Sequence, residues 1–451
     1  MKKRRAQAKM FLGRLERSNL SSAEVYYRET RGLDISGYDQ QITGIRSYTE
    51  EGLSVRTEDG NRIGSSFTEL TDRKHLEQAL AQAAEQVQYL PPDTGHVLYP
   101  GDRELFDDDC SSRELEQIPA ERKQDFVLKL ERAARALDAK VLSVPTSRYL
   151  ESHQVITIVN SRGMKKVQRF SSCAALIQVS AGNTRQVHSG SYAVADRVFY
   201  HLSPLRIAQE AVMRAVEKMN PRSIDSGTYP VVFSPEAASQ LLGAFFLSPY
   251  APWFAENVMK GRSPLAGKIG EQVASPEVTI YDHPEGSSLY ARKFDDEGVK
   301  TRKLILLQQG VLKEFAHSVY AASRLGTSPT GHGLRASFMA PVVTGLHAPC
   351  LTNGEHDLEE LFDLCGSGVY ITELDGLHAG VDVLTGNFSL SAGGFQIAEG
   401  KQKKSVGKCV AAGNIFELLE DIAAKGSDRR EDSLQRFSSP SLLVKRLSIS
   451  A

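Results

Sequence analysis

A polar loop at residues 326–337 carries the side chains of this chain that are best suited to hold a ligand. It reads Gly-Thr-Ser-Pro-Thr-Gly-His-Gly-Leu-Arg-Ala-Ser, and its glycines and proline oppose a helix. Thr330 and His332 can donate or accept hydrogen bonds, and the Arg335 guanidinium can bind a carboxylate through two parallel bonds. His378 lies in a second glycine-flanked stretch. The pattern predicts a substrate-binding loop, and a connector whose side chains bond their own backbone is an equally good interpretation.

The sequence does not indicate a catalytic centre. Its eleven histidines include no pair four or five residues apart, and its five cysteines form no Cys-x-x-Cys, so the usual zinc motifs are missing. The Gly-x-Ser-x-Gly elbow of serine hydrolases is also missing. A dispersed metal site made by His317, His332, His378 and one cysteine is a less favoured alternative. We therefore expect no catalytic residue, metal or other cofactor in this chain.

Composition places the chain among soluble proteins with more than one domain. It has 451 residues, 41% hydrophobic and 24% charged, and a formal charge of −1, which gives no general attraction to nucleic acid or to an anionic membrane. The dispersed, odd set of cysteines is typical of a reducing cytoplasm. Residues 1–17 are basic, which indicates a short helix with a solvated face, or alternatively a nucleic-acid arm. No stretch approaches the roughly 20 apolar residues of a membrane helix.

The first half alternates short strands with amphipathic helices. Residues 23–68 predict an antiparallel meander with turns at Glu51-Gly52 and Asp59-Gly60. Helical spacing of apolar residues predicts helices from about Asp72, over residues 120–137, and from Ser203-Pro204. Strands are expected between the last two helices. The predicted elements and their connections are those of an α+β domain.

The second half is rich in strands. A polar segment at 220–228 separates the helix from a new strand at 229–233, and we place the domain boundary there, giving domains 1–225 and 228–451. A capped helix begins at Ser234-Pro235, and late helices are expected near 355–366 and 415–424. The fold class predicted is α+β, with an N-terminal antiparallel sheet with helices and a C-terminal barrel-like or sandwich domain.

Several motifs resemble the TldD/PmbA family of zinc peptidases, historically called modulators of DNA gyrase. In the first half the motif is the hairpin Val-Arg-Thr-Glu-Asp-Gly-Asn-Arg-Ile-Gly at 55–64. In the second half the motifs are the loop at 326–337 and four later stretches. These stretches are Val-Tyr-Ile-Thr-Glu-Leu-Asp-Gly-Leu-His-Ala-Gly at 369–380, Leu-Thr-Gly-Asn-Phe-Ser at 384–389, Ala-Gly-Gly-Phe-Gln-Ile-Ala-Glu-Gly at 392–400 and Val-Ala-Ala-Gly-Asn-Ile-Phe-Glu-Leu-Leu at 410–419. The resemblance extends from about residue 20 to the end.

The resemblance implies a subunit without its own metal. TldD-like members carry a His-Glu-x-x-x-His helix, and the corresponding residues here, 237–247, contain no histidine, cysteine or acid. This departure is similar to the TldE/PmbA branch, which implies a TldD-like partner that supplies the zinc, a peptide substrate, a homo- or hetero-oligomer, and peptide cleavage in the cytoplasm. The chain would then be inactive alone.

Two other functions stay open. A regulatory binding protein of the gyrase-modulator kind would draw on the basic N-terminal segment, although nucleic acid is an unexpected partner for a chain of this charge. A stand-alone homodimer with a different hydrolytic or binding role is the third hypothesis.

Overall fold

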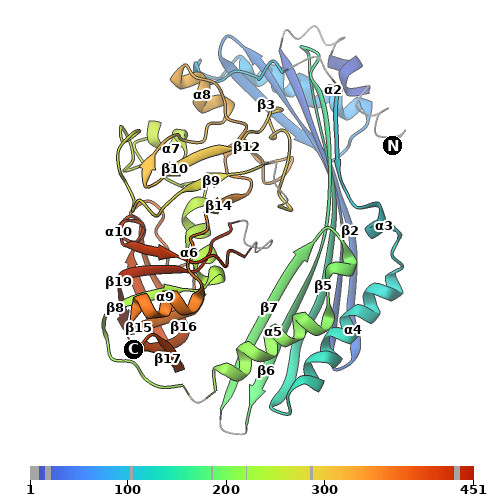
Figure 1. The fold of residues 1–451 in the computed structure, drawn as a ribbon. Helices are drawn as coiled ribbons and strands as arrows, with labels where there is room; N and C mark the ends of the chain where they lie inside the picture. Colours follow the sequence, from blue (N-terminus) through green and yellow to red (C-terminus); the bar gives the residue numbers. More distant parts are fainter. Residues whose placement is uncertain are drawn as a thin grey trace.

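One long antiparallel sheet forms the N-terminal half (Figure 1). The computed structural model describes residues 10–15, 22–101, 105–183, 186–219, 221–284, 288–430 and 437–450. The strands of this sheet are β1 (Ala23–Tyr38), β2 (Gln41–Asp59), β3 (Arg62–Thr68), β4 (Leu105–Cys110), β5 (Val141–Asn160), β6 (Lys165–Gly182) and β7 (Val187–Asp196). Their order is β3-β2-β1-β5-β6-β4, and β7 also pairs with β6. Only β4 runs parallel to its neighbour.

Two-residue turns set the register of the first hairpins. Asp39 and Gln40 (φ 48° and 59°) join β1 to β2, and Gly60 and Asn61 (φ 56° and 60°) join β2 to β3. Positive φ at both central positions gives the turn type whose twist matches that of the paired strands. The register that follows lets β3 pair with residues 53–59 of β2 only.

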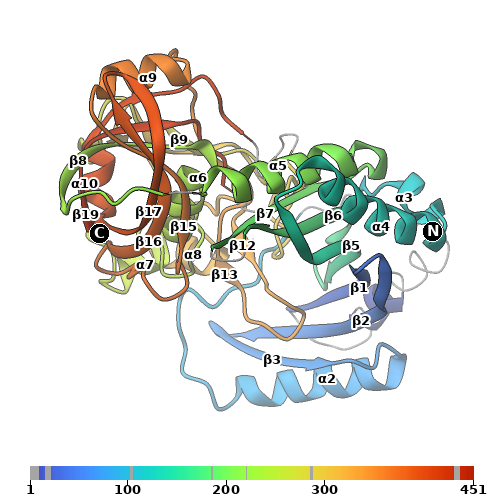
Figure 2. The ribbon, with the colours of Figure 1, turned by 90° about the horizontal axis from the view of Figure 1, so that it is seen from below.

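Helices cover the sheet. They are α2 (Arg73–Val87), α3 (Arg113–Gln117), α4 (Ala120–Leu137), the short 3-10 helix η1 (Phe199–His201) and α5 (Pro204–Glu217). The buried stripes of α4 and α5 form a core with inward residues of β5 and β6, and α2 lies along β2 and β3 (Figure 2). The side chains of Asp72 and Ser203 accept backbone N–H bonds at the starts of α2 and α5, which satisfies donors that a helix leaves free.

The C-terminal half is built on a closed barrel. β17 (Lys401–Asn414), β16 (Asn387–Ala398), β15 (Gly368–Asp375), β8 (Gly227–Phe233) and β19 (Leu442–Ser450) pair in that order, and β19 returns to β17. β18 (Ile422–Lys425) extends β19. Helices α6 (Pro235–Phe246), α9 (Leu358–Cys365) and α10 (Ile415–Glu420) pack on or inside this barrel.

Smaller elements join the barrel to the N-terminal sheet. They are α7 (Ala255–Met259), β9 (Ile280–Asp282), β10 (Leu304–Gln308), β11 (Val311–Leu312), α8 (Val319–Leu325), β12 (Gly333–Leu334), β13 (Val343–Thr344) and β14 (Pro349–Leu351). Trp253, the only tryptophan, is buried here and stacks on Phe246 with ring centroids 4.4 Å apart. This residue therefore belongs to the core.

The predicted fold class is confirmed: the protein is α+β, with an antiparallel sheet and helices followed by a barrel. The predicted helices at 120–137 and from Pro204 and Pro235 are present. The predicted domain limits, 1–225 and 228–451, meet in the segment between α5 and β8. Of the basic segment at 1–17, residues 1–9 and 16–17 lie outside the described residues. Residues 10–15 are helical, and Phe11 is buried against the sheet.

Two local predictions are wrong. Glu51-Gly52 is no turn, because β2 continues through it and Gly52 faces the ring of Phe338. The last helix ends at Glu420 rather than near 424, because residues 422–425 pair with β19. In both places a contact from a distant part of the chain overrides the local pattern.

Candidate functional site

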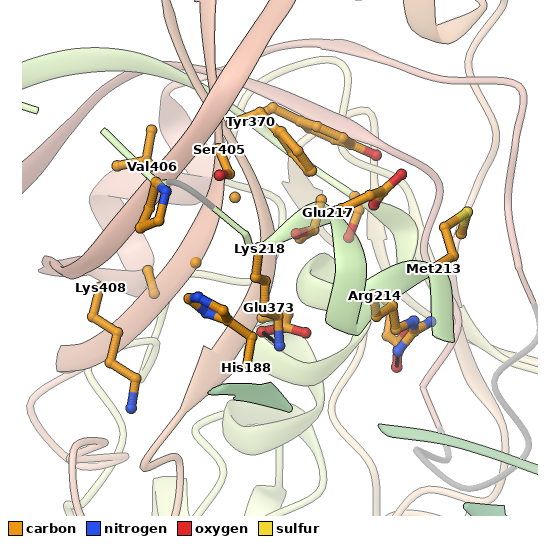
Figure 3. Close-up of a pocket in the computed structure, with 18 of the residues that line it drawn as sticks. His188, Met213, Arg214, Glu217, Lys218, Tyr370, Glu373, Ser405, Val406 and Lys408 are labelled. Carbon is orange, nitrogen blue, oxygen red and sulfur yellow. Dashed lines mark hydrogen bonds and ion pairs between the residues drawn. The ribbon is translucent and has the colours of Figure 1, made fainter. Parts of the chain in front are cut away.

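A cleft of about 720 Å³ lies between the N-terminal sheet and the barrel. We call it the interdomain cleft. Its N-terminal wall is the start of β7 and the exposed side of α5, and its C-terminal wall is the start of α6 with parts of β15, β16 and β17 (Figure 3). The side chains labelled in Figure 3 are mixed in character: His188, Met213, Arg214, Glu217, Lys218, Tyr370, Glu373, Ser405, Val406 and Lys408. Both halves of the chain are needed to form it.

Helix α5 directs two basic residues into the cleft. Arg214 and Lys218 lie four positions apart at its C-terminal end, so they point to the same side, while the opposite side of α5 is buried in the core. Cations are also favoured at this end of a helix by the backbone dipole. The helix therefore presents positive charge to the barrel.

Each basic residue pairs with a carboxylate of the other half. Arg214 makes two hydrogen bonds with Glu236 in the first turn of α6, one of them 3.1 Å long. Lys218 Nζ lies 2.7 Å from Glu373 Oε2 on β15. The four side chains are partly exposed, between 18% and 33%, so a ligand in the cleft can reach them. These two ion pairs fix the width of the cleft.

The outer edge of β7 faces this space. The amide of Asn183 donates to the Gln186 carbonyl (2.9 Å), and this bond closes the β6–β7 hairpin. Since hydrogen-bonded and non-hydrogen-bonded pairs alternate along antiparallel strands, Ser189 and Ser191 direct their backbone groups away from β6. The edge that they form has no neighbouring strand among the described residues.

Basic side chains already use part of that edge. Lys218 Nζ donates to the Ser189 carbonyl (2.6 Å), and Arg214 Nη1 donates to the Ser191 carbonyl (3.2 Å). The amides of these two serines have no partner within the described ranges. A strand edge with free amides binds extended peptides by adding one more strand.

Two titratable side chains of the cleft are Glu217 and His188. Burial and the negative charge of Glu210 raise the pKa of Glu217. His188 also lines the cleft, and its Nε2 is buried without a hydrogen-bond partner. Such groups near one another are typical of binding sites.

The predicted loop residues lie elsewhere. Thr330 and His332 are buried at 1% and 0% exposure. His332 Nδ1 lies 2.9 Å from Thr330 Oγ1 and 3.0 Å from its carbonyl oxygen, and Nε2 lies 2.9 Å from Asp282 Oδ2. Both ring nitrogens therefore have partners inside the protein. These side chains therefore stabilise the conformation of the loop. The substrate-binding role of the loop stays a prediction.

The other two predicted residues lie apart from this pair. Arg335 is buried between the halves, where it donates to Ser54 Oγ (2.9 Å) and pairs with Glu24 (3.2 Å). His378 is exposed in the turn between β15 and β16. None of the four residues belongs to the lining of the interdomain cleft, so the structure does not bring them together as one site.

One group of described residues has the spacing of metal ligands. Ligand atoms of Asp282, His332 and His347 all lie within 4.8 Å of one another, and the three could hold a metal ion. The Asp282 carboxylate already has several donors. Asp282 accepts bonds from His332, from the amide of His347 (3.0 Å) and from the amide of Ala348 (2.6 Å).

The second histidine is also bonded. His347 Nε2 lies 2.7 Å from the Gly331 carbonyl. All three residues are buried, whereas a catalytic zinc keeps one open position for water. Burial lowers the pKa of His347 to about 3, although the negative charge of Asp282 acts in the opposite direction. We conclude that these residues do not fit a catalytic metal.

No sequence pattern marks the cleft residues directly. Arg214 and Lys218 are spaced like ordinary charges on the exposed side of a helix, which is their usual meaning. One signal is the glycine pair at 393–394, because glycines inside a strand pattern indicate a bulge. Gly394 does lie at a register shift between β16 and β17, on the wall of the cleft.

The long sheet, the closed barrel and the cleft between them define a class of α+β proteins with two domains. Comparisons with known proteins show to which family of this class the chain belongs. The chain belongs to the PmbA/TldD metallopeptidase family. Residues 23–87, 113–219 and 226–451 match, in turn, the family's domain 1, central domain and C-terminal domain.

Individual relatives match along the whole chain. The metalloprotease PmbA homolog of Haemophilus influenzae is 24% identical over 449 residues, which cover 98% of this chain and 95% of that protein. A putative modulator of a DNA gyrase from Thermotoga maritima has a structure with a TM-score of 0.89 and 27% identity, covering 99% of this chain and all of that one. TldE from Thermococcus kodakarensis shares the fold, with a TM-score of 0.87 and 24% identity, covering 98% of this chain and all of that one.

Among the described residues, no helix combines the length and the apolar character needed to cross a bilayer.

Proposed function

We propose that this chain is the non-metal, TldE-like subunit of a TldD/TldE-type peptidase, which processes or degrades unfolded peptides in the cytoplasm. In this complex a TldD-like partner carries the zinc and cleaves the peptide. The present chain forms part of the chamber and holds the peptide in the interdomain cleft.

Helix α6 carries this proposal. The resemblance aligns it with the zinc helix of TldD-like relatives, and its first turn borders the interdomain cleft. Residues 235–246 read Pro-Glu-Ala-Ala-Ser-Gln-Leu-Leu-Gly-Ala-Phe-Phe. These residues provide no imidazole or thiolate, the ligands that zinc needs on such a helix. A chain of a metallopeptidase family with this helix depends on another subunit for hydrolysis.

The free edge of β7 supports the peptide part of the proposal. Backbone amides at Ser189 and Ser191 recognise a main chain rather than particular side chains. The substrate class that follows is an extended or unfolded peptide with few sequence requirements. The charged pairs Arg214–Glu236 and Lys218–Glu373 flank it.

Reconstitution tests the proposal. The chain is purified alone and together with a TldD-like relative that has the His-Glu-x-x-x-His helix, and cleavage of an unfolded peptide is followed by mass spectrometry. We expect no cleavage by this chain alone, and cleavage by the mixture that a chelator abolishes. Chelator-sensitive cleavage by the isolated chain contradicts the proposal.

An edge variant separates peptide binding from assembly. Ser191→Pro removes an amide that points away from β6, and an edge strand tolerates this change. It is expected to weaken peptide binding about tenfold or more, equivalent to one lost bond of about 1.5 kcal/mol, without changing the mass of the complex. Ser191→Ala keeps the amide and is the matched control.

A further inference from the structure

The middle of β2 is a second free strand edge, and it lies in the N-terminal sheet away from the interdomain cleft. Residues 43–51 are all exposed, including 54% of Ile45 and 42% of Tyr48. β3 ends where Thr68 meets Leu53, so no described strand covers this stretch. A long exposed edge with apolar side chains normally pairs with another chain or is protected against doing so.

The register shows which backbone groups are free. The turn at Gly60-Asn61 makes Asp59 and Arg62 a hydrogen-bonded pair, so odd-numbered residues of β2 bond toward β3 and even-numbered residues bond toward β1. The amide of Glu58 donates to Ser22 on the β1 side, as this alternation requires. The pairing of β1 with β2 has no shift between residues 44 and 59. Amide and carbonyl groups of four residues therefore point outward: Ile45, Ser47, Thr49 and Glu51.

The side chains of this edge are complementary in charge to those of a second, antiparallel copy of the same edge. Arg46, Tyr48 and Glu50 occupy every second position of β2, so their side chains lie on the same side of the sheet. The Arg46 guanidinium carbon lies 5.5 Å from the centre of the Tyr48 ring. When two antiparallel copies are centred on Tyr48, each Arg46 stands opposite the other copy's Glu50. In the same register the outward residues form the hydrogen-bonded pairs, 45 with 51 and 47 with 49.

We propose that a second copy of this chain pairs with the β2 edge, by antiparallel strand addition around a twofold axis at Tyr48. Two copies related by such an axis bury the same surface on each partner. The pairing joins both N-terminal sheets into one continuous sheet. Two Arg46–Glu50 ion pairs, one on each side of the axis, fix this register against a slip of two residues. The inference does not depend on the proposed peptidase role.

Charge reversal tests the register. The mass of the purified full chain in solution is measured by light scattering over a wide concentration range. We expect a dimer for the natural sequence, and at least a tenfold weaker dimer for Arg46→Glu or Glu50→Arg. The double variant exchanges both charges and is expected to restore the dimer. Circular dichroism confirms that each variant is folded.

A cysteine at the twofold axis gives an independent test of the proposed pairing. The two Tyr48 residues form a non-hydrogen-bonded pair, whose Cα atoms lie about 4.5 Å apart in antiparallel sheets. Tyr48→Cys should therefore give a disulfide-linked dimer on mild oxidation. Thr43→Cys, on the same strand beyond the paired region, should not.

Three outcomes overturn the inference: a natural chain that is a monomer at every concentration, a dimer that survives Arg46→Glu unchanged, or cross-linking that is equal at positions 43 and 48. If the chain is a monomer and the charge variants weaken binding to a TldD-like relative instead, the edge belongs to that relative and self-pairing is wrong.

Discussion

The guanidinium carbon of Arg335 lies 4.6 Å from the centroid of the Tyr26 ring. Arg335 comes from the loop after α8, and Tyr26 is buried in β1, so this contact joins the two halves of the molecule. Tyr26 in turn donates to Asp296 (3.3 Å), and Arg335 pairs with Glu24 (3.2 Å). Burial and the charge of Arg56 lower the pKa of Arg335. The contact is the centre of a buried polar network between the halves.

Removing Arg335 should destabilise the protein. Arg335→Ala leaves the Tyr26 ring without its cation and leaves Arg56 as the one remaining arginine paired with Glu24. Losing a buried hydrogen bond to a charged group costs about 2 kcal/mol. Denaturant unfolding measures the loss. Arg31→Ala, an exposed arginine, is the control and should change the free energy of unfolding by less than about 0.5 kcal/mol.

A second variant at this position distinguishes a structural from a substrate-binding role. If Arg335 clamps a peptide carboxylate, Arg335→Lys in the reconstituted complex raises KM and leaves the free energy of unfolding nearly unchanged. We expect the reverse, because the two polar partners of its side chain and its ring contact all lie within this chain.

Stability should fall as pH rises from about 6.5 to 8. Burial and the negative charge of Glu297 raise the pKa of Asp295 to about 8 from its ordinary 3.8. The folded chain then keeps a proton that the unfolded chain releases above pH 4, so folding is favoured at low pH and this advantage disappears as pH approaches 8. The slope is at most about 1.4 kcal/mol per pH unit.

His347 acts in the opposite direction at lower pH. Its pKa of about 3 in the folded state lies below the ordinary 6.5, so the unfolded chain binds the extra proton and stability falls as pH drops below 6.5. Above 6.5 the effect of His347 is complete, whereas that of Asp295 continues. Glu297→Gln removes the neighbouring charge and should flatten the loss between pH 6.5 and 8, as measured by melting temperature across pH. An unchanged slope would show that Asp295 is not its source.

The cluster around Asp282 should behave as structure rather than as a metal centre. Asp282→Asn places an amide against backbone N–H donors and should cost about 3 kcal/mol of stability. Zinc should not raise the melting temperature of the natural chain, whereas a bound metal at 100 times its Kd would add about 2.7 kcal/mol. Elemental analysis of the purified chain gives a second measurement. Stoichiometric zinc that Asp282→Asn and His347→Ala both remove would contradict this expectation.

The two adjacent glycines in the cleft wall should respond differently to alanine. A Cβ at Gly394 would lie 1.9 Å from the Tyr370 carbonyl oxygen, whereas at Gly393 its nearest contact is 3.6 Å away, at Glu373. Gly394→Ala must push β15 and β16 apart and should cost about 3 kcal/mol. Gly393→Ala should be tolerated. Thermal unfolding of the two variants gives the comparison, and equal losses would mean that strand separation here is not the limiting factor.

Local sequence patterns determined several helices and turns, and they showed that α6 has no zinc ligands. The apolar spacing of α4, α5 and α6 and the serine caps of α5 and α6 depend on neighbours within a few positions. They can therefore be recognised without a structure. The same holds for the turn after Asp59 and for the absence of imidazole and thiolate from α6.

Only the tertiary structure decided which side chains meet to form a candidate binding site. The partners Arg214 and Glu236 are 22 residues apart, and Asp282 and His332 are 50 apart, so no local pattern links them. The loop at 326–337 looked like a binding loop because polar residues and glycines are typical of exposed loops. Folding buried residues 330–333 and Arg335 and left 326–328 exposed. Asp282 and the N-terminal sheet supply the partners of His332 and Arg335. The interdomain cleft and the two free strand edges depend on which strands end first, and long-range pairing sets that.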